Sequence, residues 1–409
     1  MHVLYLHQYF KTPAGSGGIR SYQMARHLIK RGHSVTIVCG SSDRGGVGLD
    51  TPFRRGVRRG IVDGIQVIEF DLAYSNYDGF LKRTWTFLRF ALRSIALALT
   101  LPYDLVFATS TPLTAGIPGI VARWLRRKPF VFEVRDLWPE LPRAMGVITN
   151  PIVLRLMDWL EWVSYHAATA CIGLSPGIVQ GIQRRGIAPD RVTMVPNGSD
   201  LDIFFPSQAS VPPLPGIAPD DLLAAFTGAH GRANGLDAVL HAAAELKRRQ
   251  RHDIKLLFIG DGALKPALRA RAASEGLDNC LFLDPVSKHD LSLLMSRVDV
   301  GLMILANVPA FYYGTSPNKF FDYIAAGLPV LNNYPGWLAD LITENHCGLA
   351  IPPDDPTAFA DALVYLADHP LERTHMGTNA RALAEQEFGR EHLAEKFVNW
   401  LEIAQEPHP

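Results

Sequence analysis

Short apolar runs alternate with amphipathic stretches along most of the chain. This alternation is typical of parallel β-strands joined by crossover helices. Six apolar runs in the first half predict strands over residues 2–8, 34–40, 65–71, 104–110, 129–136 and 170–175. A short run at residues 194–200 leads into a loop, and six further runs predict strands over residues 223–230, 254–262, 280–286, 300–305, 328–334 and 348–355. The pattern predicts an α/β protein.

A proline-rich stretch without periodicity, residues 206–219, separates the two series of strands. Such composition is typical of a linker, and 409 residues are too many for one hydrophobic core. We therefore expect two doubly wound, Rossmann-like domains, over residues 1–205 and 220–385. Residues 386–409 are expected to form a helix that packs back on the first domain. Ligands of such sheets bind beyond the carboxyl ends of the strands, so the predicted site is a cleft between the domains.

The overall charge is balanced, with 40 lysine plus arginine residues against 40 aspartate plus glutamate residues. A chain without net charge has no general attraction to nucleic acid, so we expect no nucleic-acid partner. Four cysteines are scattered without metal-ligand spacing, which favours reduced thiols. The first residues enter an apolar strand without the features of a secretion signal. These observations predict a cytoplasmic protein.

Residues 80–101 come closest to a membrane-spanning segment. Four basic side chains interrupt the apolar run, at Lys82, Arg83, Arg89 and Arg93. One interpretation is a helix on a membrane surface, with Trp85, Phe87 and Leu88 toward the acyl chains. The other is a buried helix with a basic edge. Two further basic clusters in the first third of the chain favour the membrane, so we expect a peripheral protein on the inner face of the plasma membrane.

A glycine-rich turn follows the first predicted strand, with Gly15, Gly17 and Gly18 before a helix that begins near Ile19. Backbone N–H groups of such a turn can approach a phosphate, and the positive end of the helix dipole attracts an anion. The spacing matches neither the dinucleotide fingerprint nor the P-loop. A tight structural turn is the alternative that these residues leave open.

Charged residues lie at the carboxyl end of the predicted strand at residues 129–136, where catalytic groups of such sheets lie. Asp136 is the candidate catalytic carboxylate, and Glu133 and Arg135 are candidates for the acceptor side. Asp136 could instead cap the following helix. Asp200 follows an Asn-Gly turn and is expected to be mainly structural.

The second domain contains the arrangement of strand, glycine turn and helix twice. Gly228, Gly231 and Arg232 lie around the end of one predicted strand, and Gly260 and Asp261 lie at the end of the next. Both turns are similar to anion cradles, in which backbone N–H groups surround a phosphate.

A lysine and an aspartate lie three residues apart in a predicted helix that opens at Ser316 and Pro317. Lys319 would add a positive charge to a phosphate site, and Asp322 could accept hydrogen bonds from ribose hydroxyls. The alternative is a simple salt bridge between the two side chains on the helix surface.

The order of motifs along nearly the whole chain resembles a known family. These motifs are GGIRSYQMARHLIKRGHSVTIV, VPNGSDLDIF, FTGAHGRANGLDAVLHAA, IGDG, SPNKFFDYIAAGLPVL and GLAIPPDDPTAFADAL. The set resembles the retaining glycosyltransferases of the GT-B fold, family 4 type, which use nucleotide sugars. The segment EVRDLWPE is similar to bacterial enzymes of O-antigen and capsule synthesis, including N-acetylfucosamine transferases.

The resemblance implies a donor site. Gly17 and Gly18 would face the donor diphosphate and the reacting sugar, and Lys319 would contact the diphosphate. Asp322 would hold the ribose, and the backbone of Val286 would contact the base. The other predicted donor-site residues are Gly228, Gly231, Gly260, Asp261 and Ser316.

Three positions depart from the family pattern. Gly314 stands where the family has the first of two glutamates, and Asn234 stands where it has a cation before the phosphate loop. A histidine near the catalytic strand end is missing. Lys319 and Arg232 would then carry more of the charge that faces the diphosphate.

The resemblance implies transfer of a hexosyl group, including N-acetylated deoxyhexosyl groups, from a UDP-linked sugar to a polyprenyl-diphosphate-linked acceptor, with retention of configuration. Asp136, Lys319 and Arg232 would be the catalytic residues. We expect no cofactor and no metal, because the cations and the glycine turns can stabilise the leaving diphosphate. A GT-B nucleotide-sugar epimerase and a non-catalytic sugar-nucleotide-binding protein are the alternatives.

Overall fold

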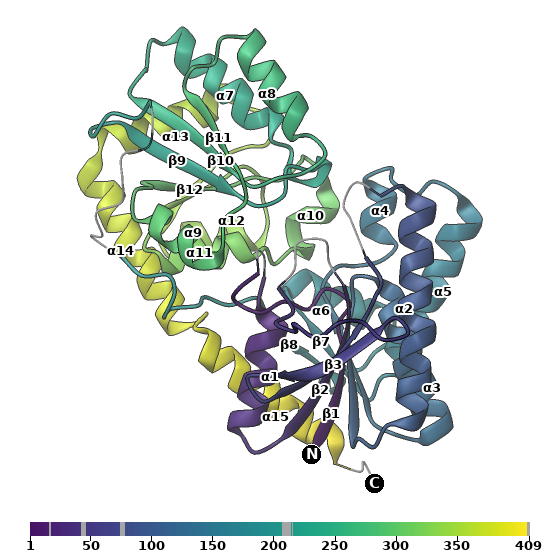
Figure 1. Ribbon diagram of the computed structural model, residues 1–409. Helices are drawn as coiled ribbons and strands as arrows, with labels where there is room; N and C mark the ends of the chain where they lie inside the picture. The colour runs from purple at the N-terminus through teal and green to yellow at the C-terminus, as the bar shows by residue number, and fades with distance from the viewer. Residues whose placement is uncertain (16–17, 42–45, 74–77, 207–213, 215, 407–409) are drawn as a thin grey trace. The chain divides into compact units, whose positions relative to one another are not determined.

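The structure, a computed structural model, describes residues 1–15, 18–41, 46–73, 78–206, 214 and 216–406 (Figure 1). Residue contacts divide the chain into two units. Unit 1 contains Met1–Pro196, Tyr313–Ser316 and Glu391–Pro409, and unit 2 contains Asn197–Tyr312 and Pro317–Arg390. Each unit is a sheet covered by helices, so the predicted doubly wound α/β class is confirmed for both. Most of the predicted linker, residues 207–213 and 215, lies outside the described residues.

The sheet of unit 1 has the strand order β3-β4-β2-β1-β5-β6-β7-β8. Its strands are β1 (His2–Leu6), β2 (Ser34–Gly40), β3 (Val57–Val62), β4 (Ile65–Phe70), β5 (Leu105–Thr109), β6 (Phe130–Val134), β7 (Ala170–Gly173) and β8 (Val192–Met194). Neighbouring strands are parallel, except for the antiparallel pair of β3 and β4. The chain order reverses at β1, between β2 and β5, and ligands of such sheets bind beyond the carboxyl ends at this point.

Strand β3 is absent from the sequence prediction. Its residues include two arginines, which favoured a surface cluster. The strand pairs with β4 across the dipeptide Asp63-Gly64, whose φ angles are 49° and 84°. Positive φ at both central residues is the geometry of a tight hairpin turn, and Asp-Gly is its sequence signal.

Helices cover both faces of the sheet in unit 1. They are α1 (Arg20–Lys30), α2 (Phe80–Thr100), α3 (Gly116–Arg126), α4 (Glu140–Ala144), α5 (Pro151–Ala167), α6 (Pro176–Arg184) and α15 (Arg390–Gln405). Successive strand residues point to opposite faces. Leu4 therefore packs in a core with Phe90 of α2, whereas Tyr5 packs in a second core with Phe397 of α15. The last helix of the chain thus contributes to the core of unit 1.

The sheet of unit 2 has the order β11-β10-β9-β12-β13-β14, and its neighbouring strands are parallel. Its strands are β9 (Leu222–Thr227), β10 (Ile254–Ile259), β11 (Cys280–Leu283), β12 (Val300–Met303), β13 (Val330–Asn332) and β14 (Gly348–Ala350). Its helices are α7 (Asp237–Arg248), α8 (Lys265–Ser274), α9 (Lys288–Met295), α10 (Pro309–Gly314), α11 (Asn318–Ala325), α12 (Trp337–Glu344), α13 (Pro356–Asp368) and α14 (Pro370–Gln386). The order reverses at β9, so the strand ends beside β9 are the corresponding place for a ligand.

Candidate functional site

A fully buried ion pair lies at the carboxyl edge of the sheet in unit 1. Glu133 of β6 and Arg20, the first residue of α1, are 0% and 1% exposed. Two guanidinium nitrogens of Arg20, Nε and Nη2, donate to Oε2 of Glu133 over 3.0 and 2.7 Å, and Thr109 donates to Oε1 over 2.8 Å. Because neighbours occupy both oxygens and no surface is exposed, Glu133 is a structural residue here. Its predicted place on the acceptor side is corrected.

Arg20 also binds the backbone that follows β8, the last strand of this sheet. It donates to the carbonyl oxygens of Val195 and Pro196, which follow β8, over 2.9 and 2.5 Å. Burial alone would raise the pKa of Glu133, but the charges of Arg20 and Arg135 outweigh it and hold the pKa below its usual range. The carboxylate therefore stays ionised, and the buried charge is paired.

Asp136 lies two residues beyond β6 and is half-buried. Thr111, which follows β5, donates from Oγ1 to Oδ2 of Asp136 over 3.1 Å. Burial raises the pKa of Asp136, and the charge of Arg135 offsets only part of the rise. The next helix, α4, begins at Glu140 and has Pro139 in its cap position. The capping alternative for Asp136 is therefore wrong.

Sequence reasoning missed a histidine at this edge. His7 directly follows β1 and is 4% exposed, and its Nδ1 atom has no hydrogen-bond partner among the described residues. Burial, together with the charges of Arg135 and Arg20, holds the pKa of His7 well below its ordinary value, so the ring is neutral. Gln8 is 2% exposed, and neither of its amide atoms has a partner within the described part of the chain. The sequence signal that could have identified His7 and Gln8 is their position at the end of the first predicted strand.

Lys319 occupies the first turn of α11 in unit 2. Its Nζ atom donates to Oδ1 of Asn234 over 3.0 Å and lies 4.3 Å from the ring centre of Phe226. A Cβ atom on Gly228 would lie 3.4 Å from Cε of Lys319. The structure thus brings Lys319 to the glycine turn that was predicted as an anion cradle. Desolvation lowers the pKa of Lys319 to about 7.

The two glycine turns of unit 2 touch one another. Gly228 and Gly260 have φ angles of 125° and 145°, and a Cβ atom on Gly260 would lie 1.9 Å from the carbonyl oxygen of Gly228. His230 donates its backbone N–H to the carbonyl oxygen of Asp261 over 3.0 Å. The close approach requires glycine at position 260, and the positive φ angle favours glycine at position 228, whether or not a phosphate binds.

Gly231 and Arg232 lie on the open side of this arrangement. A Cβ atom on Gly231 would meet no atom within 4 Å among the described residues. The Arg232 side chain is exposed and makes no hydrogen bond or ion pair within the described ranges. Its predicted contact with a phosphate stays a prediction.

Asp322 belongs to a buried ionic cluster in unit 2. Nζ of Lys288 lies 3.3 Å from Oδ1 of Asp322 and also donates to Asp200, and Nε of Arg390 donates to Oδ1 of Asp200 over 2.7 Å. The partner of Asp322 is Lys288, so the alternative of a surface salt bridge with Lys319 is wrong. Asp200 has the structural role expected from its turn.

The two carboxylates of this cluster differ. Burial alone would raise the pKa of Asp200, but the charges of Arg390 and Lys288 lower it to about 2. Burial raises the pKa of Asp322, Lys288 offsets part of the rise, and Asp200 adds to it. Asp322 is therefore the carboxylate whose charge is less well compensated, and its side chain keeps 12% of its surface exposed.

The remaining predicted residues are spread over both units. Gly18 is exposed just before α1, and Gly17 lies outside the described residues. Val286 is half-buried in the loop after β11. Ser316 is 9% exposed and belongs to the short segment that groups with unit 1, whereas Lys319 groups with unit 2.

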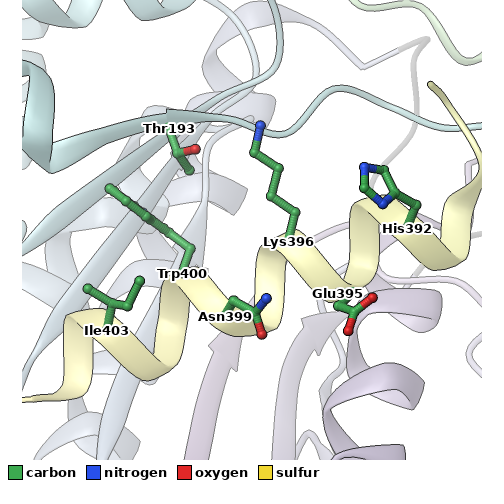
Figure 2. Close-up of a pocket in the computed structure, with 7 residues that line it drawn as sticks. All are labelled: Thr193, His392, Glu395, Lys396, Asn399, Trp400 and Ile403. Carbon is green, nitrogen blue, oxygen red and sulfur yellow. The ribbon is translucent and has the colours of Figure 1, made fainter.

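Two surface hollows lie away from these residues. Figure 2 shows one of about 370 Å³ in unit 1, lined by Thr193 of β8 and by α15 residues that include Lys396 and Trp400. The other, about 510 Å³, lies in unit 2 between α14 and the residues that precede β12 and β13. Neither contains a predicted site residue, so the candidate site is defined by the residues at the carboxyl ends of the strands. Among the described residues, no group of three His, Cys, Asp or Glu side chains could hold a metal ion, and metal independence stays a prediction.

Comparison with known proteins gives a family match for each half of the chain. The family described as "Glycosyl transferase 4-like domain" matches residues 16–198, and the family described as "Glycosyl transferases group 1" matches residues 212–383. The chain therefore contains one domain of each of these two glycosyl transferase families. The first match covers most of unit 1, and the second covers most of unit 2.

Relatives of this chain include "D-rhamnosyltransferase WbpZ" of Pseudomonas aeruginosa, which is 29% identical over 164 residues, or 40% of each chain. The chain spans about half the length of the curated relatives that it matches first. Anabaena Alr3699/HepE, solved with UDP and glucose, is similar with a TM-score of 0.70 at 17% identity, over 98% of this chain and 99% of that one. WaaG, "a glycosyltransferase involved in lipopolysaccharide biosynthesis", is similar with a TM-score of 0.70 at 19% identity, over 97% and 98%. These structural likenesses show the fold.

Proposed function

We propose that this glycosyltransferase moves a hexosyl group from a UDP-linked sugar to an acceptor sugar on a polyprenyl diphosphate lipid, with retention of configuration, during synthesis of a bacterial surface polysaccharide. The observation that carries the proposal is the position of Lys319 over Gly228, at the start of α11. A desolvated ammonium beside a glycine turn is a site for an anion, and the donor diphosphate is the anion that the family uses.

The chemistry of transfer explains why a cation is needed there. Negative charge builds on the departing diphosphate while the sugar becomes positively charged. The Lys319 ammonium and the N–H groups at the start of α11 stabilise that charge without reorganising. Arg232, exposed on the neighbouring turn, supplies a second cation when the donor is bound. Asp322 accepts hydrogen bonds from the ribose.

The edge of unit 1 supplies the groups for the acceptor. Asp136 is a carboxylate with a raised pKa, and the neutral ring of His7 can accept or donate a hydrogen bond. These two groups orient the acceptor hydroxyl, and Arg135 adds a positive charge beside them. In a retaining transfer, the leaving phosphate oxygen accepts the proton of that hydroxyl.

The finer parts of the proposal have separate support. UDP as the nucleotide is supported by the UDP complex of the Anabaena protein. A role in surface polysaccharide synthesis is supported by the lipopolysaccharide role of WaaG and by the rhamnosyltransferase relative. The lipid-linked acceptor and the inner face of the membrane rest on the family resemblance and on the exposed apolar side chains of unit 1.

The test is a transfer assay with a panel of UDP-hexoses, each with and without a polyprenyl-diphosphate-linked sugar, with products followed by mass spectrometry. We expect release of UDP only when the acceptor is present. Conversion of the donor without an acceptor would indicate an epimerase. Binding of UDP without any release would indicate a non-catalytic binding protein.

A variant at the edge of unit 1 tests the assignment of Asp136. Asp136→Asn should lower the transfer rate by roughly 10²-fold and leave donor affinity unchanged, because the side chain acts on the acceptor. Glu140→Gln, on an exposed carboxylate four residues away, is the matched control and should transfer at the normal rate. A normal rate for Asp136→Asn would remove this residue from the reaction centre.

A further inference from the structure

The buried ionic cluster of unit 2 brings together four charged side chains from distant parts of the chain. Lys288, Asp200, Asp322 and Arg390 are 6%, 4%, 8% and 7% exposed. Asp200 lies in the segment after β8, Lys288 and Asp322 belong to α9 and α11, and Arg390 is the first residue of α15. Figure 1 shows α9 and α11 next to one another in unit 2. With both carboxylates ionised, the cluster has two positive and two negative charges.

The two carboxylates share the two cations unequally. Arg390 binds both oxygens of Asp200, from Nε to Oδ1 over 2.7 Å and from Nη2 to Oδ2 over 3.2 Å. Such a two-pronged contact compensates Asp200 by itself. Among the described residues, Asp322 has one cation within ion-pair distance, Lys288, whose Nζ atom lies 3.3 Å from Oδ1. Loss of the Lys288 charge would therefore leave Asp200 paired and Asp322 without a partner.

The position of the Lys288 ammonium is fixed by its neighbours. It donates to Oδ2 of Asp200 and lies 5.3 Å from the ring centre of Phe204, which is fully buried. Asp200 is itself fixed by Arg390. The ammonium therefore meets Asp322 from a defined place, on the side of Oδ1. The Asp322 side chain keeps 12% of its surface exposed, and this part of the carboxylate is open to a ligand.

We infer that Lys288 is a positioning residue, which holds Asp322 ionised and oriented for the ribose of a ribonucleoside diphosphate. A carboxylate accepts strong hydrogen bonds from two neighbouring hydroxyls when it is ionised and correctly turned. The charge of Lys288 favours the ionised form, and its contact with Oδ1 fixes the orientation. The inference rests on the proposed function, in which Asp322 accepts hydrogen bonds from the ribose.

A purely structural cluster is the alternative, and the two carboxylates argue against it. Asp200 is stabilised by its partners, as a carboxylate that serves the fold should be. Burial raises the pKa of Asp322. Lys288 and Arg390 lower that pKa and Asp200 raises it, and burial outweighs the balance of these charges. A carboxylate kept in an unfavourable place beside a possible ligand indicates a binding role.

The arrangement predicts an acid limb in nucleotide affinity. The ribose contact needs the ionised form of Asp322, which is present above the pKa of this group and is lost as the pH falls through it. Lys288→Met removes the compensating charge, so the limb should move to higher pH. Asp200→Asn removes a negative charge and leaves Lys288 to Asp322, so the limb should move to lower pH. A general loss of structure would not move the limb in opposite directions.

The test is calorimetry with UDP, GDP and ADP, each compared with its 2′,3′-dideoxy analogue, on the acid side of neutral pH. In the original protein, at least one nucleotide should bind roughly tenfold tighter with its ribose hydroxyls than without them, the range of a charge-assisted hydrogen bond. Lys288→Met should lose most of this difference. It should bind the dideoxy analogue as the original protein does, because the diphosphate contacts are unchanged.

Two further lysine variants are the controls. Lys288→Arg keeps the charge and should keep the preference for the hydroxyls. Lys255→Met, on β10, removes a lysine that lies 3.8 Å from Asp221 in the same unit, and it should change neither the preference nor the acid limb. Equal losses of affinity for the ribonucleotide and its dideoxy analogue in Lys288→Met would overturn the inference.

Asp200→Asn keeps the test decisive if Lys288→Met does not fold. Thermal unfolding with and without nucleotide shows which variants are folded, and the acid limb of Asp200→Asn is then compared with that of the original protein. A limb that stays in place, or moves to higher pH, would overturn the inference. A shift to lower pH supports it.

The same preparations are assayed for transfer from a UDP-sugar. A preference for the hydroxyls that depends on Lys288, without any transfer, would reject the proposed function and leave the inference standing. Transfer with a preference that Lys288→Met leaves unchanged would do the reverse. Absence of the preference with all three nucleotides would overturn the inference whether or not transfer occurs.

Discussion

The carboxyl edges of the two sheets differ in whether their buried charges have a partner of opposite charge. In unit 1, the guanidinium of Arg20 and the carboxylate of Glu133 are both fully buried and paired at 2.7 Å. In unit 2, Lys319 has an amide oxygen and an aromatic ring as neighbours, and no carboxylate lies within ion-pair distance among the described residues. A buried pair serves the fold. A desolvated cation without a counter-charge lowers stability unless an anion arrives, so it indicates a binding site.

The largest expected effect comes from breaking the pair in unit 1. Glu133→Gln leaves the Arg20 guanidinium buried without a counter-charge, and the free energy of unfolding should fall by about 3–5 kcal/mol. Denaturant unfolding measures it. The control is Glu391→Gln, which removes an exposed partner of Lys30 and should hardly change the free energy of unfolding. Equal losses in the two variants would contradict the comparison.

A second comparison lies inside unit 2. Asp200→Asn removes the charge that Lys288 and Arg390 share, so the free energy of unfolding should fall by about 3 kcal/mol. Asp322→Asn should change stability little, because burial already raises the pKa of that carboxyl, but should weaken donor binding. Calorimetry with UDP alongside denaturant unfolding separates the two effects. Similar stability losses in both variants would argue against a ligand role for Asp322.

Removal of the lone cation tests the edge of unit 2. Lys319→Met should weaken UDP-sugar binding by roughly 10- to 100-fold, since a charge-assisted hydrogen bond contributes about 1.5–3 kcal/mol. The thermal unfolding temperature should stay the same or rise, because a desolvated charge is lost. Lys30→Met, at an exposed site, is the control and should change neither quantity. Unchanged affinity in Lys319→Met would reject the charge assignment.

The pH dependence follows from the pKa of Lys319, which is lowered from 10.5 to about 7 in the absence of a ligand. The ammonium is present below that pKa and is lost above it, so affinity for a UDP-sugar should fall as pH rises from 6 to 9. Stability of the unliganded protein should change in the opposite direction: this group binds fewer protons folded than unfolded between about 7 and 10.5, so stability rises with pH there. Lys319→Arg should show neither trend.

The smallest effect concerns the missing family glutamate. A Cβ atom on Gly314 would meet no atom within 4 Å among the described residues, so Gly314→Glu should leave the thermal unfolding temperature unchanged. The new carboxylate should restore the contact of the family glutamate, and the donor KM should then fall by about 2- to 10-fold, the range of one hydrogen bond. Initial-rate kinetics measure it. A loss of folding would show that the site is less open than its geometry indicates.

Sequence reasoning singled out charged residues at the end of a strand and at the start of a helix. Asp136 and Lys319 were recognised because apolar periodicity marks where each strand ends and helix begins, and that signal is local. Arg20 was missed because its partner, Glu133, is 113 residues away. The same distance hid the buried state of Glu133, which had been given an acceptor role. The exposure of Trp159 and Trp162 on α5 was not predicted, because spacing alone does not tell an outward face from an inward one.

By itself, the sequence determined the α/β class, the two series of strands, and the position of the glycine turns at the strand ends. Only the tertiary structure decided which charges are paired and which are available to a ligand. Asp200 and Arg390 meet although 190 residues separate them, while Lys319 and Asp322, three residues apart, have different neighbours. The physical reason is that the energy of a charge depends on its desolvation and on every group packed around it, and these are brought together by the fold rather than by adjacency in the chain.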